Sequence, residues 1–126
     1  MLTVAIVDDE ADLRGLVRTL LADEPAIKVV GEGGNAEEAI DLAMNKCPDV
    51  MILDRMMPGQ DGLAAIPRIR ELSPNTKILM FTAAPERSLF DSTTLAAPDR
   101  LMGKTESVLA LVPAIMELGA MEGTSL

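Results

Sequence analysis

Short, mostly apolar runs alternate along the chain with segments in which apolar residues recur at helical spacing. Continuous runs of this kind suit strands that helices cover on both faces, as in parallel sheets. Four clear runs and a weaker fifth fit the pattern: Leu2–Val7, Ile27–Gly31, Val50–Leu53, Ile78–Phe81 and Leu101–Gly103. The alternation predicts parallel strands joined by helices.

Five segments with helical character separate or follow these runs. Three have apolar residues at helical spacing: Leu13 to Leu21, Ala36 to Ala43 after a candidate cap at Asn35, and Leu63 to Leu72 after Asp61-Gly62. The fourth lies around Glu86–Ala96, and the fifth runs from about Thr105 or Glu106 to Leu118. Pro113 predicts a kink or a shortened first part in the fifth. We expect one doubly wound α/β domain over residues 1–120 with a five-stranded parallel sheet, then a short C-terminal tail at residues 121–126.

The charge balance and the missing residue types exclude several classes of function and of catalytic group. The chain has 11 Lys and Arg against 20 Asp and Glu, a formal net charge of −9, and no His, Trp or Tyr. Nucleic-acid binding needs clustered cations and aromatic stacking platforms, so direct binding is not expected. Without His there is no Ser-His or Cys-His nucleophile, and the single Cys47 excludes an internal disulfide. Carboxylate, hydroxyl and lysine groups remain.

A membrane span or a secretory signal is not expected either. The longest uninterrupted apolar run, Val108–Met116, has about half of the ~18 residues that suggest a span, and it contains Pro113. Asp8 and Asp9 directly follow the first apolar run, and no basic residue precedes that run. We therefore expect a cytoplasmic protein.

Polar residues stand where the predicted strands end. Asp8, Asp9 and Glu10 follow the first strand, and Asp54, Thr82 and Lys104 follow the third, fourth and fifth. Each has a simple structural explanation on its own, such as a helix cap for Asp8 or Asp9. Sites in open α/β sheets form at the carboxyl ends of the strands, so the whole set together predicts a functional site.

The acidic residues of this set are expected to bind a cation, because their negative charges repel one another when they lie close together. Two carboxylates ~4 Å apart repel by roughly 4 kcal/mol at an effective dielectric of ~20. Oxygen ligands without His or thiolate favour a hard cation such as Mg²⁺. A metal beside a free carboxylate, the Thr82 hydroxyl and the Lys104 ammonium is suited to hold a phosphoryl group.

These residues carry a resemblance to a known family. The chain resembles a response-regulator receiver domain of two-component signalling, from Val4 to about Leu118. The matching motifs are Val7-Asp8-Asp9-Glu10, the segment from Asp54 to Asp61-Gly62, Thr82-Ala83, and Lys104. The resemblance implies a flavodoxin-like fold, with strand order 2-1-3-4-5 and five helices.

The resemblance also implies roles for individual residues. Asp54 would be the phosphoacceptor, and Mg²⁺ would be bound directly by Asp9 and Asp54, through water by Asp8, and by the backbone carbonyl of Met56. Thr82 and Lys104 would contact the phosphoryl group. The chain would not be an enzyme beyond its own phosphorylation and the hydrolysis of its aspartyl phosphate.

The donor histidine would belong to a sensor histidine kinase or a phosphotransfer domain, because this chain has no His. The output would pass to a partner or to a C-terminal output domain outside this sequence. The resemblance is also compatible with a phosphorylation-dependent homodimer. The last helices and the fifth strand would form the output surface.

Three alternative functions compete with this one. One is a phosphorylation-independent receiver that serves as a docking module. Another is a small Mg²⁺-dependent phosphohydrolase with Asp54 as nucleophile, against which Met56 stands where the haloacid-dehalogenase type needs a second Asp. A flavin-binding protein lacks ring-stacking residues near its strand ends, apart from Phe81.

Four positions depart from the family pattern. Leu101, three residues before Lys104, replaces a usual aromatic residue, and Arg100 stands where a small residue is common. Thr105 replaces a frequent Pro after the lysine, and Pro113 interrupts the last helix. We expect conventional phosphorylation chemistry and an atypical output face.

Overall fold

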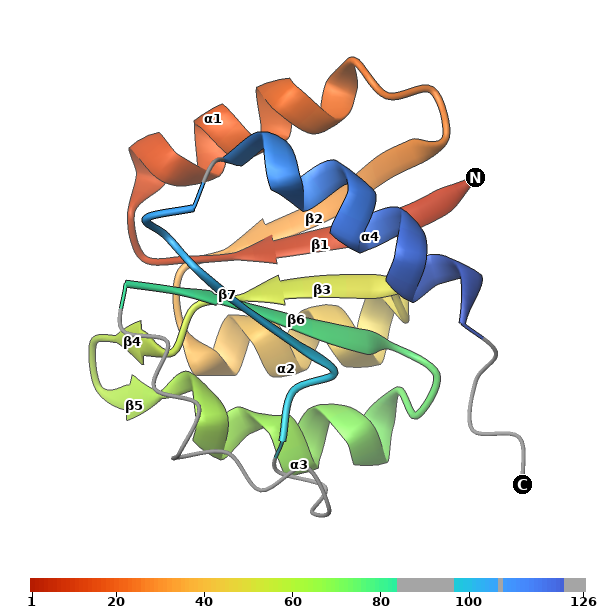
Figure 1. Ribbon diagram of the computed structural model, residues 1–126. Helices are drawn as coiled ribbons and strands as arrows, with labels where there is room; N and C mark the ends of the chain where they lie inside the picture. Colours follow the sequence, from red (N-terminus) through yellow and green to blue (C-terminus); the bar gives the residue numbers. More distant parts are fainter. Residues whose placement is uncertain (84–96, 107, 122–126) are drawn as a thin grey trace.

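A single parallel sheet organises the molecule. The computed structural model describes residues 1–83, 97–106 and 108–121. Five strands lie in the order β2-β1-β3-β6-β7 (Figure 1). Their bounds are β1 Leu2–Val7, β2 Ile27–Gly33, β3 Val50–Leu53, β6 Lys77–Thr82 and β7 Arg100–Gly103. All four neighbouring pairs are parallel.

A short antiparallel hairpin, β4 (Met56–Met57) with β5 (Gln60–Asp61), follows β3 and stands apart from this sheet. When only the strands of the main sheet are counted, their order is 2-1-3-4-5. The doubly wound α/β fold and its predicted strand order are therefore confirmed.

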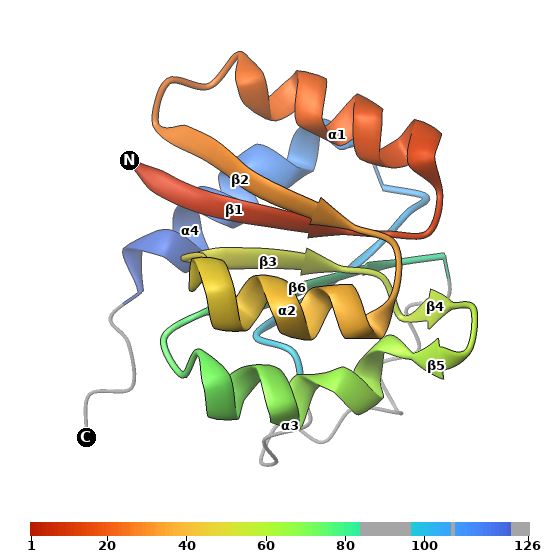
Figure 2. The ribbon, with the colours of Figure 1, turned by 180° about the vertical axis from the view of Figure 1, so that it is seen from behind.

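Two pairs of helices cover the two faces of the sheet. Helices α1 (Ala11–Ala22) and α4 (Leu111–Ala120) lie on one face, and α2 (Ala36–Lys46) and α3 (Gly62–Leu72) lie on the other (Figures 1 and 2). Strand β1 supplies both cores: Val4 and Ile6 pack with α1 and α4, whereas Ala5 and Val7 pack with α2 and α3. Burial on both faces explains why the strands are apolar along their length rather than alternating.

The number and bounds of the helices differ from the prediction. The described residues contain four α-helices rather than five, and the segment predicted as a helix at 86–96 lies outside the described residues. The last helix begins at Leu111, after a 3-10 turn at Val108–Ala110, and not at Thr105 or Glu106. Pro113 is the third residue of α4, where a backbone N–H has no partner within the helix. The expected shortening of the first part of this helix is confirmed.

Side-chain caps fix the starts of α2 and α3. Asn35 Oδ1 accepts a hydrogen bond from the Glu38 N–H at 2.8 Å, which confirms the predicted cap. Asp61 Oδ1 accepts one from the Leu63 N–H at 2.9 Å. Both caps lie at the edge of the sheet where the strands end. Within the described residues, no helix has the length and apolar composition needed to cross a membrane.

Candidate functional site

The predicted site residues gather at one edge of the sheet. Asp8 and Asp9 directly follow β1, Asp54 follows β3, Thr82 ends β6 and Lys104 follows β7. These four strands are consecutive neighbours, so their carboxyl ends lie side by side. The Asp8 and Asp54 side chains are buried, at 5% and 3% exposure, whereas Asp9 is exposed.

One ammonium group joins the two buried carboxylates. Lys104 Nζ lies 2.8 Å from Asp8 Oδ2 and 3.1 Å from Asp54 Oδ2. The Lys104 side chain is itself only 14% exposed. In the absence of a metal, this lysine therefore provides the positive charge that offsets the repulsion between the acids.

The second oxygen of each buried carboxylate binds the backbone. Asp54 Oδ1 accepts a hydrogen bond from the Met56 N–H at 3.2 Å, and Asp8 Oδ1 accepts one from the Glu10 N–H at 2.9 Å. Helix α1 has Glu10 as its N-cap residue, with no side-chain cap bond. Asp8 and Asp9 are therefore not helix caps, and that simple explanation for them is wrong.

Burial and charge shift two ionisation equilibria. Burial raises the pKa of the Asp54 carboxyl above its ordinary value of 3.8, and the charge of Asp8 raises it further; the Lys104 contact opposes this. Burial works to lower the pKa of Lys104, but its hydrogen bonds to Asp8 and Asp54 outweigh this and raise it above 10.5. Lys104 is therefore charged at neutral pH.

Thr82 lies one strand away from Asp54, at the same edge. It is fully buried, and the register pairs it with Gly103 at the end of β7. Its carbonyl accepts a hydrogen bond from the Lys104 N–H at 2.8 Å. The pairing of β6 with β7 thus brings the hydroxyl-bearing residue and the lysine together.

The loop after Asp54 is closed tightly on itself. A Cβ at Gly62 would lie 2.2 Å from the Asp54 carbonyl oxygen, so this close approach requires glycine. The Gly62 N–H donates to the Arg55 carbonyl at 2.7 Å, and Arg55 Nε lies 3.1 Å from Asp61 Oδ2. These contacts hold the start of α3 against Asp54 and fix the backbone around Met56.

Two contacts at the site could not be predicted from the sequence. Glu10 Oε1 lies 3.3 Å from Lys104 Nζ, and Arg14 Nη1 donates to the Asp8 carbonyl at 2.5 Å. Glu10 belongs to the acidic run that the sequence displays, although nothing in the run distinguishes a lysine contact from solvent exposure. Arg14 carries no sequence signal, because only the folded helix directs it toward β1.

The acidic cluster has the composition of a magnesium site. One carboxylate oxygen from each of Asp8, Asp9 and Asp54 lies within 4.8 Å of the others. Hard divalent cations prefer such oxygen ligands, and Mg²⁺ commonly uses few carboxylates and keeps several waters. The exposure of Asp9 leaves one side of the cluster open to solvent. The residues present therefore fit this metal.

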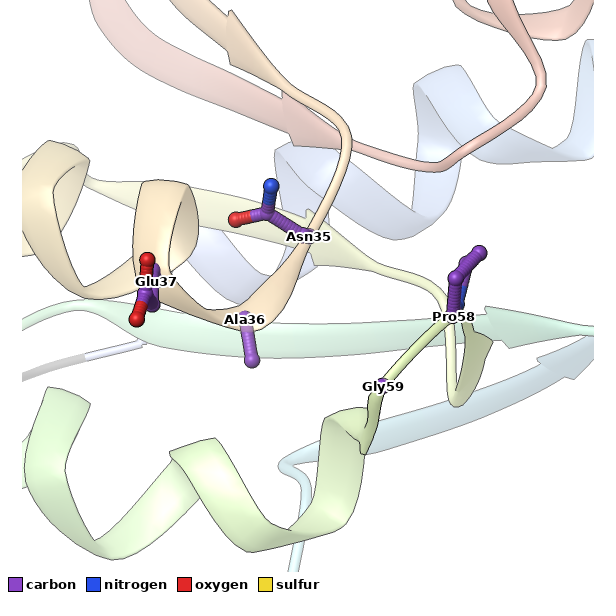
Figure 3. A pocket seen from close by; sticks show the side chains of 5 residues that line it. All are labelled: Asn35, Ala36, Glu37, Pro58 and Gly59. Carbon is purple, nitrogen blue, oxygen red and sulfur yellow. The ribbon is translucent and has the colours of Figure 1, made fainter.

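A separate small pocket lies between the start of α2 and the loop after β3. It has a volume of about 280 Å³ and is lined by Asn35, Ala36, Glu37, Pro58 and Gly59 (Figure 3). Neither the acidic cluster nor Lys104 lines it. The chemistry-bearing groups therefore lie at an open edge and not in this pocket.

A family model described as the response regulator receiver domain matches residues 4–115. The nitrate/nitrite response regulator protein NarL of Escherichia coli is 39% identical over 82 residues, which cover 65% of this chain and 38% of that protein. A protein-glutamate methylesterase/protein-glutamine glutaminase of Methanosarcina acetivorans is 43% identical over 83 residues, covering 66% and 24%. The chain thus spans less than two-fifths of the length of these relatives.

Solved structures agree with the family match. A two-component response regulator of the LuxR family from Aurantimonas sp. superimposes with a TM-score of 0.85 at 28% identity. The match covers 95% of this chain and 86% of that one.

Proposed function

The chain belongs to the response regulator receiver domain family, and from this premise we propose that it takes a phosphoryl group from a partner's phosphohistidine onto Asp54. The groups that surround Asp54 support this proposal most directly. Its buried carboxylate lies 3.1 Å from the Lys104 ammonium and beside two further carboxylates, at an open edge of the sheet. A nucleophile that attacks a phosphoryl group needs positive charge beside it to neutralise the phosphoryl oxygens, and Lys104 supplies such a charge here.

The proposed transfer is a single displacement at phosphorus. An Asp54 carboxylate oxygen attacks the phosphorus in line, a new P–O bond forms, and the P–N bond to the donor histidine breaks. The histidine nitrogen keeps the electron pair of the broken bond and takes up a proton. Lys104 and the Thr82 hydroxyl contact the oxygens of the transferred group, which the charge of Lys104 partly neutralises.

We assign the metal-binding role to four groups of this chain. Asp9 and Asp54 would hold Mg²⁺ directly, Asp8 through a water molecule, and Met56 through its backbone carbonyl. When bound, the ion supplies positive charge against the phosphoryl oxygens. The Met56 N–H already binds Asp54 Oδ1, so the Met56 peptide is close to the acceptor carboxylate.

Phosphorylation of Asp54 changes what Lys104 contacts. The lysine now bridges Asp8 and Asp54, and new phosphoryl oxygens would compete for its ammonium. Because Lys104 directly follows β7, a shift of this side chain acts on β7 and on the turn before α4. We propose that this part of the surface carries the output, without the aromatic residue that Leu101 replaces.

The proposed reaction defines the partners. A sensor histidine kinase or a phosphotransfer domain supplies the phosphohistidine, and an output partner, an output domain or a second copy of the chain responds to the switch. We place this exchange in the cytoplasm. Beyond its own phosphorylation the chain would catalyse only the hydrolysis of its aspartyl phosphate.

Intact mass spectrometry tests the function. The protein is incubated with Mg²⁺ and acetyl phosphate, and we expect a gain of one phosphoryl group that Asp54→Asn abolishes. Asp41→Asn, at an exposed position on α2, is the matched control and should retain the gain. No gain with acetyl phosphate or with a phosphorylated kinase would leave the docking module as the better explanation. Sustained turnover of an unrelated phosphate ester would favour a phosphohydrolase.

A further inference from the structure

Arg14 on α1 contacts the backbone that joins the two adjacent acids of the site. Its Nη1 donates a hydrogen bond of 2.5 Å to the Asp8 carbonyl oxygen. Side chains on a helix point back toward its N-terminus, so an arginine in the second turn of α1 reaches the end of β1. Figure 1 shows α1 beginning at the edge where β1 and β2 end.

The bonded oxygen belongs to the peptide group between Asp8 and Asp9. Peptide groups are planar, so a bond that fixes the Asp8 carbonyl also fixes the direction of the Asp9 N–H. On the other side of Asp8, its N–H donates to the Gly33 carbonyl at 3.0 Å. Arg14 therefore completes the fixation of this turn.

Asp9 depends on this fixation more than Asp8 does. The Asp8 carboxylate is held by Lys104 and by the Glu10 N–H. For Asp9, by contrast, the described residues provide no hydrogen bond or ion pair, and its side chain is exposed. The backbone is what directs the Asp9 carboxylate toward the cluster, and Arg14 holds that backbone.

A carboxylate on a neighbouring strand holds Arg14 in turn. Glu32 of β2 lies 3.4 Å from Arg14 Nε, and its other oxygen pairs with Arg18 Nη1 at 2.5 Å. The Arg14 side chain is 24% exposed, whereas that of Arg18 is 54% exposed. Arg18 shares the helix and the Glu32 partner but does not bond to the Asp8 carbonyl, which makes it a natural comparison.

We propose that Arg14 is a positioning residue: through the Asp8–Asp9 peptide it presets the Asp9 carboxylate for divalent-cation binding. The proposal rests on the proposed metal-dependent function of the acidic cluster. Groups that orient metal ligands typically change affinity about 10- to 100-fold when they are removed. For an arginine that acts through a backbone carbonyl, we expect the lower end of this range.

Calorimetric titration of metal-free protein with Mg²⁺ alone gives the first measurement. We expect Arg14→Gln to weaken binding about tenfold, Arg14→Lys to weaken it less, and Arg18→Gln to leave it unchanged. The lysine variant keeps the charge but lacks the fork that binds the carbonyl and Glu32 together. Thermal unfolding confirms that each variant is folded.

The second measurement needs no metal. We expect the NMR order parameter of the Asp9 N–H to fall from about 0.85 toward 0.6 in Arg14→Gln and to stay high in Arg18→Gln. If Arg14 only linked α1 to β2 through Glu32, its substitution would change neither the Mg²⁺ affinity nor the order parameter of the Asp9 N–H. The proposal is overturned if Arg14→Gln binds Mg²⁺ like the wild type, or if Arg18→Gln loses as much affinity. A wild-type protein that binds no Mg²⁺ would overturn the proposed function itself.

Discussion

The Lys104 ammonium lies 3.1 Å from an Asp54 carboxylate oxygen, although 50 residues separate the two in the sequence. Parallel pairing of β3 with β6 and of β6 with β7 creates this contact. The same ammonium also contacts Asp8, so a single lysine offsets the charges that a metal ion would otherwise offset. The stability and the metal affinity of the site are therefore linked through Lys104.

Removal of Lys104 should destabilise the metal-free protein and strengthen metal binding. Lys104→Met leaves two buried carboxylates without their cation, a loss of about 3 kcal/mol for a broken buried ion pair. The same change removes a positive charge that repels Mg²⁺, so we expect several-fold tighter binding. Urea unfolding and calorimetric titration measure the two effects. Lys46→Met, at an exposed position on α2, should change neither; a Lys104 variant with weaker Mg²⁺ binding contradicts the expectation.

The raised pKa of Asp54 predicts a pH dependence of stability. The folded protein binds the Asp54 proton more tightly than the unfolded chain, whose value is near the ordinary 3.8. The stability that this group contributes is therefore present below pH 3.8 and is lost as the pH rises through the folded-state pKa. The Asp54→Asn variant has no carboxyl to deprotonate at this position, so it does not lose this stability as the pH rises.

In metal-free buffer, the free energy of unfolding of Asp54→Asn should thus increase relative to that of the wild type as the pH rises through the acidic range. At neutral pH, where the wild-type carboxyl has lost its proton, we expect Asp54→Asn to be the more stable of the two proteins. Denaturant titrations at a series of pH values give the difference between the two proteins. A difference that does not vary with pH, or a less stable variant at neutral pH, would count against the raised pKa.

Mg²⁺ should stabilise the protein by binding only the folded state. At ten times its dissociation constant, an ion stabilises by about 1.4 kcal/mol, which raises the Tm of a domain of this size by about 3 to 6 °C. Asp9→Asn should reduce the shift strongly. An equal ionic strength of NaCl is the control, because general screening of a chain with net charge −9 also raises stability. Equal shifts in the two salts would argue against a specific site.

Gly62 should tolerate no side chain. Gly62→Ala would place a Cβ 2.2 Å from the Asp54 carbonyl oxygen, which is backbone and cannot move aside easily. We expect a loss of about 2 to 4 kcal/mol together with weaker Mg²⁺ binding, because the Asp54 loop must shift. Gly15→Ala on α1 is the matched control. Its Cβ would meet only the flexible Arg18 side chain at 3.6 Å, and we expect a gain of up to about 1 kcal/mol from helix propensity.

Much of the architecture was predictable because burial on both faces leaves a strong sequence signal. Leu2–Val7 and Val50–Leu53 form strands with the predicted bounds. The last helix was less predictable, because apolar composition from Val108 onward does not distinguish a 3-10 turn from an α-helix. Its start depends on how the turn after Lys104 closes through the Glu106 side chain, which accepts from the Gly103 N–H at 2.8 Å.

The chemical groups that meet at the sheet edge could be predicted from the sequence, because they follow from the order of the residues that end the main strands. Asp8, Asp9, Asp54, Thr82 and Lys104 are local signals, because each directly follows or ends an apolar run. Which of these groups are in contact depends on the packing of the folded chain. The bridge from Lys104 to Asp8 and Asp54 and the bond from Arg14 to the Asp8 carbonyl join distant elements. Such contacts depend on strand register, burial and side-chain direction, which are properties of the packed chain and not of any single segment.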